Sequence, residues 1–168
     1  MSECLEKNNF IAGMDRRPKE IYGLSNCTWY RERSCCTWTE AMSVFQNMMP
    51  LQTSSESCRN HMNYLMCYFC SPEQYLWFQD TVHVCKSFCD AVYSHCKDAK
   101  YNGIEIGEKY ENGKAFCEAQ HLHFVDSNKD CFEFDDSFFG GDSRRLRAHS
   151  IITLAFFLMW FLFYFILT

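Results

Sequence analysis

Hydrophobic positions between Ser54 and Phe69 recur at the spacing of an α-helix. Serine side chains at the start of this stretch can cap a helix, and Pro72 stops one soon after its end. The first predicted helix therefore spans residues 54–69, and its inward face carries Cys58, Met62, Leu65 and Met66.

A second predicted helix runs from Thr81 to Asp98, and most of its inward positions are cysteines. The apolar face repeats at intervals of four, three and four residues through Cys85, Cys89, Val92 and Cys96. An inward row of cysteines indicates a helix that is linked to several separate segments. It does not fit an exposed redox motif.

The remaining segments are shorter or less regular. Residues 1–26 are polar and predict an extended arm that one disulfide, through Cys4, would hold in place. Residues 98–114 are rich in Gly, Asn and charge, and the pairs Asn102-Gly103 and Asn112-Gly113 predict a loop or a short hairpin. A short helix is expected over residues 115–124.

Residues 151–168 are uncharged and strongly apolar, and as a helix they would extend about 27 Å, the thickness of a hydrocarbon core. They predict a membrane-anchor segment behind a polar spacer over residues 135–150. Small residues before the spacer favour a glycolipid (GPI) anchor signal with attachment at Gly141. A transmembrane helix is the alternative, because arginines precede the apolar segment and would hold that flank in the cytosol.

The first residues contain no apolar stretch of signal-peptide length. Two explanations are open: the true start lies upstream, or the protein is tail-anchored and reduced in the cytosol. The first is favoured because twelve cysteines in 168 residues fit an oxidising, secretory compartment.

The cysteine pattern predicts a disulfide framework. The number of cysteines is even, and the adjacent pair Cys35-Cys36 has no role in a four-ligand zinc site. Aromatic residues make up 17% of the chain, so the core of the domain expected over residues 27–134 depends on rings and covalent links. The expected fold is mainly α, a small disulfide-rich domain with short β or irregular segments, followed by the C-terminal hydrophobic helix.

Neither charge nor motifs support nucleic-acid binding or catalysis. A net charge of −5 disfavours nucleic acid as a partner. The histidines are scattered, and no nucleophile, phosphate-loop or dinucleotide motif accompanies them. We expect no enzyme activity and no cofactor.

Cys67-x2-Cys70 could be half of a zinc site or a redox pair. The nearest second pair of ligands is His121 and His123, but their spacing suits a strand better than the usual helical zinc motif. Both cysteines also close a helix, where the dipole disfavours a thiolate. Disulfides without a metal are the expected state.

Aromatic side chains crowd around the Ser71-Pro72 turn, where they could fill the core or line a groove for a flat ligand. The candidate ligand- or partner-binding residues are Tyr64, Tyr68, Phe69, Tyr75, Trp77 and Phe78. Separately, Asn26-Cys27-Thr28 matches the glycosylation acceptor pattern, which makes Asn26 a candidate site.

The cysteine spacing resembles that of the folate-receptor-like cysteine-rich domains, the family of folate receptors, riboflavin-binding protein and hedgehog-interacting protein. The resemblance covers about residues 4–134 and rests on these motifs: Cys27-Thr-Trp-x5-Cys35-Cys36, Cys58-x8-Cys67, Cys70-Ser-Pro and Cys85-x3-Cys89-x6-Cys96. Trp77-Phe78, Val84 to Cys89 and Phe116-Cys117 are most similar to the hedgehog-interacting branch.

The resemblance implies a pairing that uses every cysteine once. The implied disulfides are Cys4–Cys35, Cys27–Cys67, Cys36–Cys70, Cys58–Cys96, Cys85–Cys131 and Cys89–Cys117.

The resemblance also implies that the family's folate site is missing here. The carboxylate that anchors the pterin ring in folate receptors corresponds to Leu65, which cannot accept a hydrogen bond. Their basic stretch and Trp-rich loop have no counterpart in residues 80–84 and 101–114. We expect no high-affinity folate binding.

These observations predict a non-enzymatic, membrane-anchored extracellular domain that binds a protein partner or a small flat ligand. The alternative is a vitamin-binding or uptake receptor that stacks a flavin or pterin between aromatic side chains. A third class, a tail-anchored cytosolic protein that holds metal with its cysteines, is distinguished by the oxidation state of those cysteines.

Overall fold

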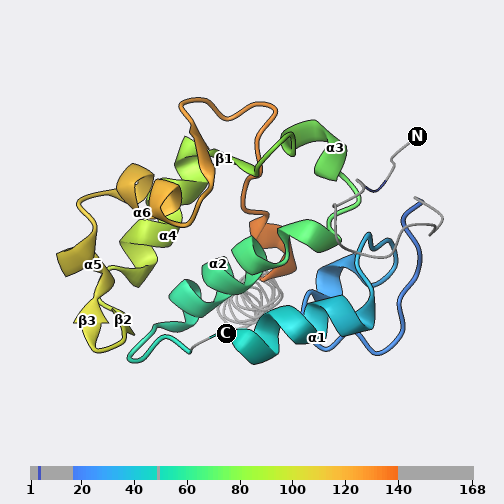
Figure 1. Cartoon of the computed structure of the whole chain (residues 1–168), viewed down its shortest axis with the longest axis horizontal. Coiled ribbons are helices and arrows are strands. Elements are labelled where there is room, and N and C mark those ends of the chain that lie inside the picture. Colours follow the sequence, from blue (N-terminus) through green and yellow to red (C-terminus); the bar gives the residue numbers. More distant parts are fainter. Residues whose placement is uncertain (1–3, 5–16, 49, 140–168) are drawn as a thin grey trace, which may run out of the picture. The chain divides into compact units, whose positions relative to one another are not determined.

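The computed structural model describes Cys4, residues 17–48 and residues 50–139. These residues are mostly helical, with short strands and six disulfides, which confirms the predicted class of a mainly helical, small disulfide-rich domain (Figure 1). The chain divides into two compact units, Met1–Phe134 and Asp135–Thr168. The expected hydrophobic helix over 151–168 and the anchor candidate Gly141 lie outside the described residues.

The second unit is described only at its start. There η3 (Asp136–Phe138) is capped by Asp135, whose carboxylate accepts a hydrogen bond of 2.9 Å from the Ser137 backbone N–H. Within the described ranges of the chain, no helix is long and apolar enough to cross a membrane.

Residues 17–26 pack into the first unit. Lys19 and Ser34 exchange backbone hydrogen bonds of 3.0 and 2.8 Å. Leu24 is 4% exposed, in a cluster that includes Cys27 and Cys36. This part of the expected arm therefore contributes to the core.

Two helical elements follow, η1 (Thr28–Tyr30) and α1 (Trp38–Asn47). The hydrophobic periodicity does not predict α1, but its start carries a readable signal. Thr37 and Glu40 form a capping box, in which each side chain accepts a hydrogen bond from the other residue's backbone N–H.

Helix α2 (Glu56–Met66) confirms the first predicted helix. Ser55 caps it, because its side chain accepts a hydrogen bond of 3.0 Å from the Cys58 backbone N–H. The helix ends earlier than expected, and the chain continues through η2 (Tyr68–Cys70) and α3 (Gln74–Trp77).

The second predicted helix is correct only in its later part. Helix α4 spans Lys86–Cys96, whereas the residues before it form β1 (His83–Cys85). Strand β1 pairs in parallel with β4 (His123–Val125), and it also forms a bridge to Phe132. The expectation of helix from Thr81 was wrong because these two partners satisfy the backbone of β1 in an extended form.

The segment after α4 forms the expected hairpin, from β2 (Lys100–Tyr101) and β3 (Ile104–Glu105), and α5 (Ile106–Lys109) follows. The turn residues Asn102 and Gly103 have positive φ values of 52° and 82°. This is the geometry that the Asn-Gly pair favours in two-residue hairpin turns.

The second Asn-Gly pair is not a turn. Asn112 caps α6 (Gly113–Ala119), and its side chain accepts a hydrogen bond of 2.9 Å from the Ala115 backbone N–H. The short helix predicted over residues 115–124 thus starts at Gly113 and ends at Ala119, after which the chain leads into β4.

The structure contains the same six disulfides that the resemblance implies. They are Cys4–Cys35, Cys27–Cys67, Cys36–Cys70, Cys58–Cys96, Cys85–Cys131 and Cys89–Cys117. The paired cysteines are 28 to 46 residues apart. Closing a loop of that length lowers the entropy of the unfolded chain by an amount worth roughly 4 kcal/mol per bridge.

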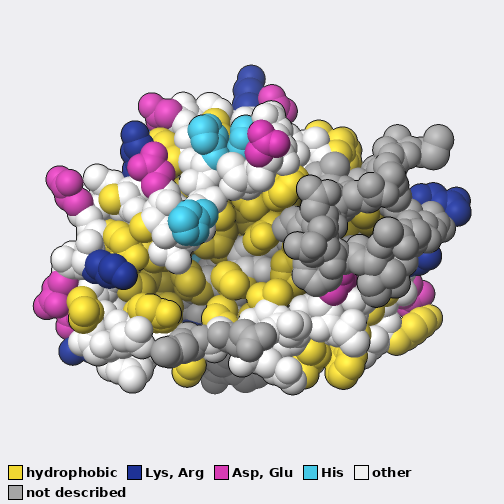
Figure 2. Space-filling model, in the orientation of Figure 1, with side chains coloured by type: hydrophobic (Ala, Val, Ile, Leu, Met, Phe, Trp, Pro, Cys, Tyr) yellow, Lys and Arg dark blue, Asp and Glu magenta, His cyan; other side chains and the backbone are white. Residues whose placement is uncertain are grey.

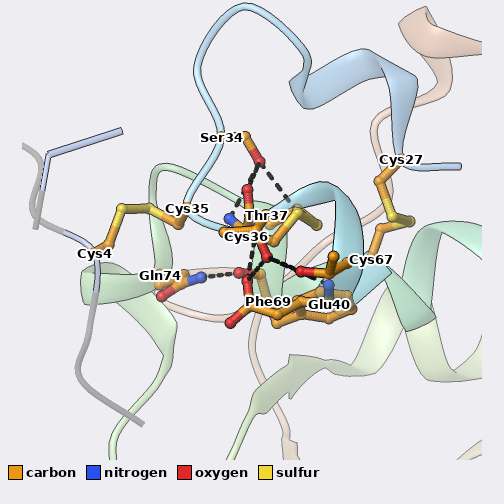
Figure 3. Close-up of a disulfide and its surroundings, with 12 residues drawn as sticks. Cys4, Cys27, Ser34, Cys35, Cys36, Thr37, Glu40, Cys67, Phe69 and Gln74 are labelled. Atoms are coloured by element: carbon orange, nitrogen blue, oxygen red, sulfur yellow. Dashed lines mark hydrogen bonds between the residues drawn. A yellow bond between two sulfur atoms is a disulfide. The ribbon is translucent and has the colours of Figure 1, made fainter. Parts of the chain in front are cut away.

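Bridges that tie down the amino-terminal part gather around the adjacent pair Cys35-Cys36. Figure 3 shows Cys4–Cys35 and Cys27–Cys67 close to Cys36. The Ser34 hydroxyl accepts a hydrogen bond of 3.2 Å from the Cys36 backbone N–H, which helps to fix the chain between the bridges.

Helix α4 packs against both α2 and α6 (Figure 1). Its contact with α6 is especially close at Gly113, where an added Cβ atom would lie 2.6 Å from the Cys89 carbonyl oxygen and 2.7 Å from the Asp90 nitrogen. Only glycine fits this position without moving backbone.

We predict that Gly113→Ala lowers the free energy of unfolding by about 1 to 3 kcal/mol, because the new methyl group must separate α6 from α4. Urea unfolding of the oxidised protein measures this. The neighbouring Lys114→Ala is the control. It should cost less than Gly113→Ala, at most about 1 kcal/mol, because Lys114 is exposed and forms an ion pair with Glu118 and a cation–π contact with Phe124. Equal losses in the two variants would contradict the close helix contact.

Candidate ligand-binding site

The six aromatic residues predicted as a binding face do not form one surface. Tyr64 and Trp77 are each 5% exposed and belong to the core. Tyr75 is 50% exposed and points to solvent, whereas Tyr68, Phe69 and Phe78 are half-buried. The structure therefore separates the candidates into core, edge and surface positions.

A stack of rings lies between α2 and the segment that follows β4. His61 and Tyr64 are one turn apart on α2. The His61 ring is stacked on Phe134, with centres 3.9 Å apart and an angle of 10° between the planes. The Tyr64 ring is stacked on Phe132 at 5.2 Å and 12°.

Ring contacts extend this stack in both directions. Phe132 meets Trp77 at 4.8 Å, Trp77 meets Tyr68 at 6.2 Å, and His61 meets His95 at 4.6 Å. We call the continuous series the aromatic run, and its members are Phe69, Tyr68, Trp77, Phe132, Tyr64, Phe134, His61 and His95.

The aromatic run packs against the core of the domain. Phe88 of α4, which is 1% exposed, contacts the rings of Tyr64, Phe132 and Phe134. Phe132 is also fixed through its backbone, since its N–H donates to the His83 carbonyl oxygen at 2.7 Å. The core therefore holds these rings in fixed positions.

The edges of the aromatic run reach the surface. Tyr68, Phe69 and Phe134 are half-buried, and His95 is exposed. Figure 2 shows hydrophobic side chains gathered over the region where Figure 1 places α2 and α4, with histidine side chains at the border. Such a surface offers stacking contacts with a polar border.

The aromatic run includes a histidine that is neutral near pH 7. His61 is 7% exposed, and its Nδ1 lies 2.8 Å from the Ser57 carbonyl oxygen, which assigns the proton to Nδ1. Burial lowers the pKa of His61, and the nearby His95 lowers it further, while the bond to Ser57 opposes both effects. A neutral ring is the form that packs on Phe134.

The cysteine motif considered for zinc or redox chemistry is structural. Cys67 is bonded to Cys27 and Cys70 to Cys36, so neither is available as a thiolate. All twelve cysteines are paired, which is inconsistent with the reduced cytosolic alternative.

Sequence reasoning missed half of the aromatic run: His61, His95, Phe132 and Phe134. His61 could have been found, because it stands one helical turn before Tyr64 on a predicted helix. Phe132 and Phe134 alternate in FEFDD as in a strand, but only the fold shows that this segment returns to α2.

The geometry defines a disulfide-linked helical domain with a packed series of rings, of which Tyr68, Phe69, Phe134 and His95 reach the surface. The model of the folate receptor family matches residues 3–148 of the chain. The chain belongs to the folate receptor family.

Curated relatives are similar to the chain over more than half of its length. It is 28% identical over 138 residues to the riboflavin-binding protein of Gallus gallus, a match that covers 70% of the chain and 56% of the relative. It is 26% identical over 117 residues to folate-binding protein 1 of Arabidopsis thaliana, covering 57% and 39%. The chain thus spans about half the length of the curated relatives it matches.

We predict that acidification destabilises the protein partly through His61. Because its pKa is lowered in the folded state, the unfolded state binds the proton more readily. The contribution of neutral His61 to the free energy of unfolding is therefore fully present above about pH 6.5. It is lost as the pH falls through the lowered pKa. His61→Phe keeps a ring against Phe134 and should show a smaller loss of unfolding free energy between pH 7.5 and 5.

Urea titrations at the two pH values test this, with Ser94→Ala as a control that keeps every histidine. An equal loss in wild type and His61→Phe would rule out the role assigned to His61.

Proposed function

We propose that the chain is a non-enzymatic extracellular binding domain that holds a small flat heterocycle against the aromatic run. Membership of the folate receptor family supports this class, as do relatives named for riboflavin and folate binding. The observation that carries the proposal is the outer edge of the aromatic run, where the half-buried Phe134 stacks on the buried His61 and the half-buried Tyr68 contacts the buried Trp77.

The chemistry of the surface favours an aromatic ligand. A flat ring that stacks on Phe134 or Tyr68 removes apolar area from water on both partners. The neighbouring imidazoles supply polar contacts at the border, where His95 is exposed. A rigid surface of this kind loses little side-chain entropy when the ligand binds.

The ligand is not folate under this proposal. Leu65 stands where the resemblance places the pterin-binding carboxylate, and it is 4% exposed within the core. An apolar side chain leaves the hydrogen-bond donors of a pterin without a partner. This lowers the affinity for the pterin and also the ability of the site to distinguish a pterin from other flat rings. A flavin, which stacks without needing that carboxylate, fits better.

A second candidate is a protein partner, the function that the proposed hedgehog-interacting branch would imply. Tyr75 and Leu76 on α3 are adjacent, large and about half exposed, at 50% and 49%. Exposed apolar pairs of this kind suit a protein contact better than a small ligand.

The remaining parts of the proposal concern location. We propose a cell-surface protein that is tethered through residues 151–168, with Gly141 as the attachment site of a GPI anchor or, in the alternative, with a transmembrane helix. Asn26 is half-buried beside the bonded Cys27 and is the proposed glycosylation site.

We predict that the protein quenches riboflavin fluorescence on binding. Phe134→Ala should weaken binding about tenfold or more, since loss of one stacking ring costs about 1 to 3 kcal/mol. Tyr75→Ala is the matched control, because this exposed ring lies outside the aromatic run, and it should leave the affinity unchanged.

The protein-partner function would be favoured instead by two results together: no response of the protein to flavins, and binding of the oxidised protein to cells that the variant Leu76→Glu loses.

We also predict that folic acid binds at least about tenfold more weakly than riboflavin, because Leu65 provides no acceptor for the pterin. Quenching of intrinsic tryptophan fluorescence measures folate binding, with a folate receptor that keeps the carboxylate as the positive control. Tight binding of folic acid to the oxidised protein would show that the chain uses another acceptor.

A further inference from the structure

Two histidine side chains lie next to each other on the sheet formed by β1 and β4. His83 and His123 are partners in the parallel register, and their ring centres are 4.5 Å apart. His123 is exposed and His83 is half-buried. The next pair in the register, Val84 and Phe124, faces the other side of the sheet.

The backbone around this pair is fixed on both strands. The His123 N–H donates to the Val82 carbonyl oxygen at 2.8 Å, and the His83 carbonyl oxygen accepts from the Phe132 N–H at 2.7 Å. The bridge Cys85–Cys131 ties the end of β1 to the segment that contains Phe132. The backbone therefore holds the two imidazole side chains in a fixed relative position.

Their separation fits two ligands of one metal ion. Imidazole nitrogen binds such an ion at about 2.0 to 2.1 Å, so the ring centre stands about 3.2 Å from the ion, and two neighbouring ligand positions at about 90° to 109° place ring centres about 4.5 to 5.2 Å apart. The observed 4.5 Å falls in this range. Small rotations of the two rings would direct one nitrogen of each at a shared point.

We propose that His83 and His123 form a surface site for a divalent transition-metal ion for which imidazole is a suitable ligand. Within the described ranges, no group of three or more His, Cys, Asp or Glu side chains could hold an ion, so water fills the other coordination positions. The site therefore binds Cu²⁺ more tightly than Ni²⁺ or Zn²⁺, in the order set by the metals themselves.

A second histidine pair in the structure provides a matched comparison. His61 and His95 have ring centres 4.6 Å apart, almost the same separation. In that pair, however, His61 is 7% exposed, stacks on Phe134 and uses its Nδ1 for the Ser57 carbonyl. The two pairs differ in how exposed their imidazole rings are to solvent, and not in the separation of the rings. This difference in exposure assigns the metal to His83 and His123.

The test titrates Cu²⁺ into the full chain with its six disulfides, in mild detergent, by calorimetry and electron paramagnetic resonance. The expected result is one Cu²⁺ bound by two imidazole nitrogens. His83→Gln and His123→Gln should each weaken binding at least about tenfold, because either change removes the chelate. The matched change His95→Gln, and His121→Gln next to the site, should leave the affinity unchanged.

Thermal unfolding without metal checks that each variant is folded. The proposal is overturned if folded His83→Gln and His123→Gln bind Cu²⁺ as wild type does. It is also overturned if His95→Gln causes the larger loss, or if the spectrum of wild type shows fewer than two imidazole nitrogens.

Discussion

The fold depends on the covalent links that converge on α4 and the residue before it. Cys85, Cys89 and Cys96 connect this one element to Cys131, Cys117 and Cys58, three segments that lie on both sides of it in the sequence. The helices are short, and isolated helices of such length are marginal in water. The bridges remove much of the entropy of the unfolded chain, so a small core of bonded cysteines, aromatic rings and a few aliphatic side chains is sufficient.

The same links place the aromatic run. Phe132 follows Cys131 directly, and the bridge to Cys85 brings it beside β1, within stacking distance of Tyr64 on α2. The aromatic run is thus made from residues that are distant in sequence and that the disulfide framework holds side by side. A framework of this kind can be kept while the side chains that it holds differ from one protein to another.

Local signals in the sequence predicted where helices occur better than they predicted the residues at which the helices begin and end. Serine capping and apolar spacing located α2, and the Asn102-Gly103 pair located the hairpin. The start of α4 could not be found in this way, because the choice between strand and helix at His83 to Cys85 is made by pairing with residues about forty positions later. The partners of Tyr64 and His61 were unpredictable for the same reason, whereas the resemblance already implied the bridges that bring them together.

The connectivity has a consequence for how the protein must mature. No disulfide joins two cysteines that are consecutive along the chain; for example, Cys27 lies inside the Cys4–Cys35 loop and is bonded outside it. Cysteines that became oxidised in the order of their synthesis would therefore form only wrong pairs. The native set requires exchange between thiols and early bridges, and it cannot be complete until Cys131 has been made.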